Sequence, residues 1–282
     1  MMRPTMPVGA DNPSSASQAI RMVDQQIASI NDLSIPSGFS GAEQMQMALI
    51  QMQSTARGWP PVKRNILFAA QACVAYGAYA TKIGMASEDA QKIIQEVSEF
   101  KVHDLNDIVT RFSSTKTQFD AFNQAMEDAY SQGANANQAA ATAIDQRGLD
   151  IQNRINNLNA QINNLDSAGS IFLDIISLGG VAIADIVKIR SEISELNSEK
   201  QYEYAQERSY QLALYTFQNA LNSTKLTSYA LSTVGVSLQQ SVNALDDVTA
   251  GSSKNLVVLR ALLAQFKSQY AGAVTDAQKF LA

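Results

Sequence analysis

The sequence predicts an all-α protein, an elongated up-and-down bundle of long helices with an apolar head hairpin between two coiled-coil arms. Apolar residues recur at spacings of three and four through most of the chain, which is the helical period. No stretch alternates apolar and polar residues as a half-buried strand would, and no Asn-Gly or Asp-Gly pair marks a β-hairpin. Helices of about 40 residues would be about 60 Å long, which suits a drawn-out bundle.

Breaks and caps divide the first half of the chain into helices. A serine at 14 or 15 caps a first helix that runs to about residue 32, where the sequence SIPSG ends it. A second helix covers 41–57. The prolines after Gly58 end it and start a third helix over 62–83, whose apolar residues on most faces predict packing on all sides. Acidic residues after Ser87 begin a long helix, which the glycine and asparagines of 133–137 can bend or end.

The most informative segment is the apolar run at 168–187, AGSIFLDIISLGGVAIADIV, which only Asp174 and Asp185 interrupt. Polar segments with a narrow apolar stripe lie on both sides of it, at Ile151, Ile155, Leu158, Ile162 and Leu165 and again at Ile186, Ile189, Ile193 and Leu196. This spacing predicts two antiparallel helices, the arms, which meet along a seam at roughly 138–167 and from 188 onward. Gly179 and Gly180 lie near the middle of the run, where the helices would have to turn.

The helical rhythm continues from the second arm to Val248, and a last helix follows the turn at 250–253. We therefore divide the chain into a disordered N-terminus (1–13), a first bundle part (14–167), the head (168–187) and a second bundle part (188–282). The isoleucine, valine and glycine content of the head allows either a helix or a short β-tongue.

Composition and motifs speak against catalysis and nucleic-acid binding. The net charge of −5 and the pI of about 5.0 leave no basic patch for nucleic acid or anionic lipid. The single histidine, His103, has no partner at the spacing of a zinc site, and the single cysteine, Cys73, excludes an internal disulfide and reads as a buried core residue. No nucleotide-binding or hydrolase motif occurs. We expect no enzyme, no catalytic residue, no metal and no cofactor.

The head predicts contact with a membrane, because an apolar segment exposed at the end of a polar helical rod is unfavourable in water. Its candidate insertion residues are Ile171, Phe172, Ile175, Ile176, Leu178, Val181, Ile183, Ile186 and Val187, and its candidate hinges are Gly169, Gly179 and Gly180. The alternatives are a buried helical corner of a larger bundle, a coiled-coil adaptor whose tip docks a partner, and a membrane-remodelling protein that makes no pore. The apolar segment 66–80 either shelters the head in water or forms ordinary core.

The heptad arms at 149–167 and 186–200, the head between them and the long flanking helices resemble the cytolysin A type of α-helical pore-forming toxins. That group includes components of haemolysin BL and non-haemolytic enterotoxin and the Xax and Yax binary cytotoxins. The resemblance implies a soluble protomer that releases its head at a target-cell lipid membrane and assembles with copies or partner subunits into a ring. The N-terminal residues have no apolar signal region, so we expect secretion by a route other than a Sec signal peptide.

Overall fold

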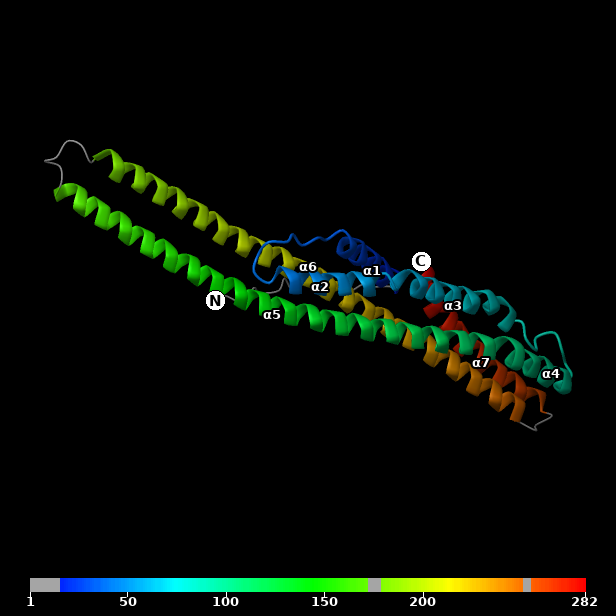
Figure 1. Ribbon diagram of the computed structural model, residues 1–282. Helices are drawn as coiled ribbons and strands as arrows, with labels where there is room; N and C mark the ends of the chain where they lie inside the picture. Colours follow the sequence, from blue (N-terminus) through cyan, green and yellow to red (C-terminus); the bar gives the residue numbers. More distant parts are fainter. Residues whose placement is uncertain (1–15, 172–178, 251–254) are drawn as a thin grey trace. The chain divides into compact units, whose positions relative to one another are not determined.

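The computed structural model describes residues 16–171, 179–250 and 255–282, with backbone only at 165–171 and 179–185 (Figure 1). Over these residues every regular element is a helix, which confirms the predicted all-α class. The helices are α1 (Ala16–Asn31), α2 (Ala42–Ala56), α3 (Trp59–Ala80), α4 (Ala90–Phe100), the π-helix η1 (Lys101–Leu105), α5 (Asn106–Ile171), α6 (Gly179–Ala250) and α7 (Leu256–Leu281).

The chain divides into two compact units. Unit 1 takes in Met1–Asn31, Ser54–Asp128 and Phe217–Ala282, as far as they are described, and unit 2 takes in Asp32–Gln53 and Ala129–Thr216. The long helices α5 and α6 each supply residues to both units. Unit 1 therefore holds α1, α3, α4, η1, α7 and one end each of α5 and α6, and unit 2 holds α2 up to Gln53 with the arms.

The core of unit 1 lies between α3 and α7. The hydroxyl of Tyr270 on α7 donates a hydrogen bond to the carbonyl oxygen of Cys73 on α3, 3.2 Å away. Phe100, Phe266 and Tyr270 pack ring to ring, with centroids 5.8–6.1 Å apart. Cys73 is completely buried, as predicted, and burial raises the pKa of its thiol to about 12. These contacts make the buried side of α3 part of the core of unit 1.

The prediction that the third helix packs on all sides is wrong. Phe68 and Tyr79 of α3 are 57% and 51% exposed, so one face of the helix remains open to solvent. The helix also begins earlier than expected, at Trp59, with Pro60 and Pro61 in its first turn. Prolines fit there because the first N–H groups of a helix have no partner within it.

The long helix expected to start after Ser87 begins at Ala90, where the Asp89 side chain caps it by accepting a hydrogen bond from the Gln91 N–H at 2.9 Å. A π-helix, Lys101–Leu105, separates α4 from α5, and His103 lies exposed within it. Lys101 forms an ion pair with Asp246 of α6. A π-helical turn has one residue more than an α-helical turn, and the spacing of apolar residues in the sequence does not indicate it here.

In unit 2, α5 runs without a break through 133–137, so the helix does not end there, which was one of the two expectations for this segment. Gly133 is buried, and a Cβ atom at this position would lie 2.7 Å from a methyl of Leu214 and 3.4 Å from the sulfur of Met52. The Tyr210 hydroxyl donates a hydrogen bond to the Gly133 carbonyl oxygen at 3.1 Å. Close packing therefore outweighs the cost of about 1 kcal/mol that glycine brings to a helix.

Candidate membrane-insertion hairpin

The two arms meet along the predicted seam. Ile151, Ile155 and Leu158 of α5 form one buried cluster with Leu196 of α6, and Ile189 and Ile193 pack against it. Within unit 2 the arms lie side by side and antiparallel (Figure 1, green and yellow). The apolar stripes on both sides of the head thus belong to one helical hairpin, which confirms the predicted arms.

Charged pairs border the seam on its solvent side. Arg147 pairs with Glu199 at 2.5 Å, and Arg154 pairs with Glu192 at 2.5 Å. Moving from Arg147 to Arg154 advances one heptad along α5, and moving from Glu199 to Glu192 goes back one heptad along α6. The two pairs therefore repeat the same antiparallel register as the apolar seam.

The ionisation of groups along the arms supports this arrangement. The pKa of Arg147 is raised, chiefly by its hydrogen bond to Glu199 and by the charge of that carboxylate. The pKa of Tyr204 is raised by partial burial and by Asp145, whose carboxylate accepts its hydrogen bond at 3.3 Å. Both shifts favour the proton-bearing form, so the pair at Arg147 stays charged and Tyr204 stays neutral near neutral pH.

The predicted head residues lie in the sequence between the two arms, at the end of α5 and the start of α6 and in the segment that connects them. Helix α5 ends at Ile171 and α6 begins at Gly179, so Gly179 and Gly180 form the first turn of α6 and not the link between the helices, and Gly169 lies within α5. The remaining head residues are placed as follows: the α6 backbone includes Val181 and Ile183, Ile186 is half-buried, Val187 is 61% exposed, and Phe172, Ile175, Ile176 and Leu178 lie outside the described residues.

The end of the head that the structure describes is apolar and bordered by cations. Val187 is exposed, and Lys188 and Arg190 follow it, both exposed. Long basic side chains next to an exposed apolar residue can lay their methylene stems on the apolar surface and keep their charges in water. In the described ranges, no helix has a stretch that is long and apolar enough to span a bilayer.

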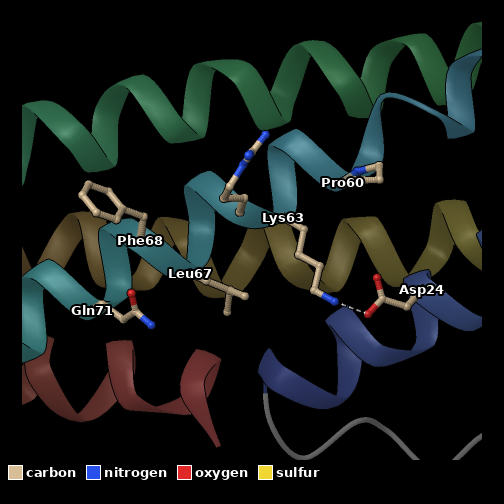
Figure 2. A pocket seen from close by; sticks show the side chains of 7 residues that line it. Asp24, Pro60, Lys63, Leu67, Phe68 and Gln71 are labelled. Carbon is tan, nitrogen blue, oxygen red and sulfur yellow. Dashed lines mark hydrogen bonds and ion pairs between the residues drawn. The ribbon is translucent and has the colours of Figure 1, made fainter.

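Unit 1 has a groove of about 540 Å³ (Figure 2). Residues of α1 and α3 line it, among them Asp24, Lys63, Leu67 and Phe68. Its carboxylate is already engaged, because Asp24 accepts hydrogen bonds from Lys63 at 2.5 Å and from the Trp59 indole at 2.7 Å. Nowhere in the described part of the chain do three or more His, Cys, Asp or Glu residues gather as a metal site would need.

No protein-family model and no curated protein sequence matches the chain. Several solved structures, in contrast, are similar to the chain. The pre-pore of AhlB, from a tripartite α-pore-forming toxin of Aeromonas hydrophila, is 15% identical, with a TM-score of 0.72 over 94% of this chain and 92% of AhlB. The SmhB pore of the tripartite α-pore-forming toxin Smh from Serratia marcescens is 11% identical, with a TM-score of 0.72 over 93% and 98%.

A chain of the XaxAB pore complex from Xenorhabdus nematophila is 11% identical, with a TM-score of 0.53 over 95% of this chain and 96% of that chain. At these identities the likeness concerns the fold. The likeness covers nearly the whole chain in each case, and it agrees with the resemblance that the arms and the head carry in the sequence. The chain therefore has the fold of these α-pore-forming toxin components.

Proposed function

We propose that the chain is a pore-forming toxin, or one component of a multi-part pore-forming toxin, that inserts its head (168–187) into a target-cell lipid membrane and oligomerises. In this proposal it acts outside the cell that makes it. The single observation that carries the proposal is the hairpin itself: two polar arms, joined by a narrow apolar seam, lead directly into the most apolar segment of the chain.

The free-energy balance of the head favours insertion. A carboxylate near the centre of a bilayer, as Asp174 would be, costs about 2.5–3.5 kcal/mol on insertion scales. Each large apolar side chain that leaves water contributes about 1.5–3 kcal/mol. The head has nine candidate insertion residues of this kind, from Ile171 to Val187. Their combined gain exceeds the cost of Asp174 several times over.

The head needs shelter until a membrane is present, which makes it a two-state element. Gly169, Gly179 and Gly180 are our candidate hinges, because glycine adopts backbone conformations that other residues avoid. The solved structures of similar fold support the same picture, since the AhlB structure is a pre-pore and the SmhB and XaxAB structures are pores. Copies of this chain or partner subunits would complete the assembly.

The substitution Ile176→Asp tests the proposal. It adds a third carboxylate to the head beside Asp174 and Asp185, so we expect a large loss of dye release from phosphatidylcholine vesicles with an unchanged helical circular dichroism spectrum. The matched control is Leu149→Asp, because Leu149 is an apolar residue of α5 that is 65% exposed and lies outside the head. Equal dye release by wild type and Ile176→Asp would overturn the proposal.

The same experiment separates the alternatives. Stable dimers in size-exclusion chromatography that do not respond to vesicles would favour a coiled-coil adaptor. Vesicle binding without dye release would favour membrane remodelling. Dye release that depends on Ile176 and not on Leu149 supports a pore made through the head.

A further inference from the structure

We propose that the uncharged face of α6 around Gly235 is a protomer contact, and that it docks on the uncharged face of α3 around Tyr79 of a second copy of this chain. The inference rests on the proposed function, since it names the surfaces through which copies would assemble. Both faces belong to unit 1, and neither involves the head or the arms.

The α6 face is unusually poor in charge for a helix in contact with water. Between Phe217 and Leu245 the only charged residue is Lys225, which pairs with Glu127 of α5 at 3.1 Å. Exposed helix faces normally carry charged residues, whereas the centres of protein interfaces are depleted of them and enriched in tyrosine. Tyr229 is 76% exposed and Val236 is 58% exposed on this helix.

A groove runs beside these residues, between α5 and α6. It has a volume of about 430 Å³, and residues that line it include Phe112, Lys116, Leu231, Gly235, Val236 and Gln239. A Cβ atom at Gly235 would meet no atom within 4 Å, so the groove leaves the helix backbone open. Glycine within a helix costs about 1 kcal/mol relative to alanine, and no contact within unit 1 offsets that cost here. The charge of Lys116 is balanced by Asp120 at 2.7 Å.

The exposed face of α3 is also poor in charge of its own, although the Arg111 guanidinium of α5 lies 5.4 Å from the centroid of the Phe68 ring. No charged residue occurs between Asn65 and Thr81, yet Phe68 and Tyr79 are more than half exposed. Gln71 and Ala75 lie between them at helical spacing and are exposed as well. The aromatic residues project from this face, whereas the α6 face offers a groove.

The two faces suit each other better than they suit other occupants. Neither helix carries an unpaired charge on its face, and the two cations of α5 beside the faces, Lys116 and Arg111, are already paired with Asp120 and Asp107. Their contact would therefore leave no ion unpaired, whereas a charged partner would lose its hydration without compensation. The exposed side chains of Gln71, Tyr79 and Tyr229 also bear polar groups that need hydrogen-bond partners, which lipid tails do not provide. The faces share no helix, so the contact is heterologous, and successive copies can add in one direction until a ring closes.

Cross-linking tests the contact directly. Val236→Cys and Tyr79→Cys are made in separate preparations, mixed, added to phosphatidylcholine vesicles and treated with a short bismaleimide. The native Cys73 is buried and its thiol keeps its proton, so only the introduced cysteines react. We expect dimers linked between positions 236 and 79. In the control pair, Met47→Cys replaces Tyr79→Cys, because Met47 is exposed on α2 outside both faces, and little product should form.

Charge substitutions give a second readout. Val236→Lys or Tyr79→Glu alone should lower the amount of assembled protein on vesicles about tenfold or more, because a single unpaired charge would enter the contact. An equal mixture of the two variants should recover assembly, because each lysine can then meet a glutamate. Both positions are exposed, and circular dichroism checks that the fold is kept.

The outcomes of this inference and of the proposed function are distinguishable. If wild type releases dye but the control pair cross-links as well as the 236–79 pair, or Val236→Lys assembles like wild type, the protomer contact is wrong and the head keeps its role. If the 236–79 pair cross-links but no dye is released, the contact stands and the pore does not. If neither occurs, both are overturned.

Discussion

Arg147 on α5 and Glu199 on α6 form an ion pair across the two arms, with the arginine Nη2 2.5 Å and Nε 2.9 Å from Oε1 of the glutamate. Both side chains are partly exposed, so water and salt weaken their attraction. Such surface pairs contribute about 0–1 kcal/mol. The pair therefore helps to set the register of the arms, whereas the buried seam supplies most of their stability.

Reversing one charge tests the role of this pair. We expect Arg147→Glu to lower the free energy of unfolding by up to about 1 kcal/mol in low salt and by less in high salt, because ions screen exposed charges. The double variant Arg147→Glu with Glu199→Arg should recover most of the loss. Urea unfolding at two salt concentrations measures both effects, and a loss that high salt does not reduce would contradict the explanation.

Truncating a seam residue should cost more. Leu158 is buried in the cluster with Ile155 and Leu196, so Leu158→Ala should lower the free energy of unfolding by about 2–5 kcal/mol. The control is Leu149→Ala on the same helix, whose exposed side chain should change stability by no more than about 0.5 kcal/mol. Similar midpoints for the two variants in urea would mean that the seam does not hold the arms together.

The arms could be predicted from the sequence because their signal is local and periodic. Ile151, Ile155 and Leu158 follow the heptad, and a narrow apolar stripe in a polar helix has few ways to be buried. The helix breaks at Ser34–Gly38 and after Gly58 could also be predicted from the sequence, since proline and glycine act on the backbone nearby. For the head, the sequence identifies the segment and the structure places its two ends.

The features that the sequence did not predict depend on contacts between distant residues. Gly133 continues a helix because Leu214 and Met52 pack against it, and nothing near Gly133 in the sequence indicates this. The open face of α3 looks like core in the sequence, because Phe68 and Tyr79 are aromatic and their neighbours are apolar. The π-helix at Lys101–Leu105 adds one residue to a turn without changing the apolar rhythm enough to be seen.

Two glycines should respond to alanine in opposite ways. Gly41 has a φ of +81°, and a Cβ atom there would lie 2.5 Å from the Cβ and 2.7 Å from the Cα of Ala140 on α5. Gly41→Ala should therefore destabilise the protein by about 2–4 kcal/mol, combining backbone strain with overpacking. Gly235→Ala, in open space on a helix, should stabilise it by about 0.5–1 kcal/mol. Thermal unfolding compares the two, and equal shifts would contradict both arguments.

Alkaline pH should reveal the burial of Tyr210. Burial raises the pKa of its hydroxyl from 10.0 to about 12. The unfolded chain loses this proton first, so the contribution of Tyr210 to stability is complete below about pH 10 and declines as the pH rises towards about 12. Each pKa unit corresponds to about 1.4 kcal/mol. The free energy of unfolding should therefore fall steeply over this range.

The variant Tyr210→Phe isolates that contribution. Near neutral pH it should cost about 1 kcal/mol, because the hydrogen bond to the Gly133 carbonyl oxygen is lost. Between about pH 10 and 12 its stability should fall less than that of wild type, so the two urea-unfolding curves approach or cross. Tyr229→Phe is the control, since folding leaves the Tyr229 side chain largely in water. Parallel pH profiles for wild type and Tyr210→Phe would show that Tyr210 does not titrate as proposed.

Asp24 and the single tryptophan, Trp59, provide a fluorescence test of unit 1. Trp59 is almost fully buried, and its indole N–H donates to Asp24, which also pairs with Lys63 (Figure 2). Asp24→Ala leaves that buried N–H without its acceptor and should cost about 1–3 kcal/mol. Asp24→Asn keeps an acceptor and loses mainly the partly exposed ion pair, so it should cost about 1 kcal/mol or less. Urea unfolding followed by tryptophan emission measures both, and an equal loss in the two variants would mean that the ion pair, and not the indole hydrogen bond, determines stability here.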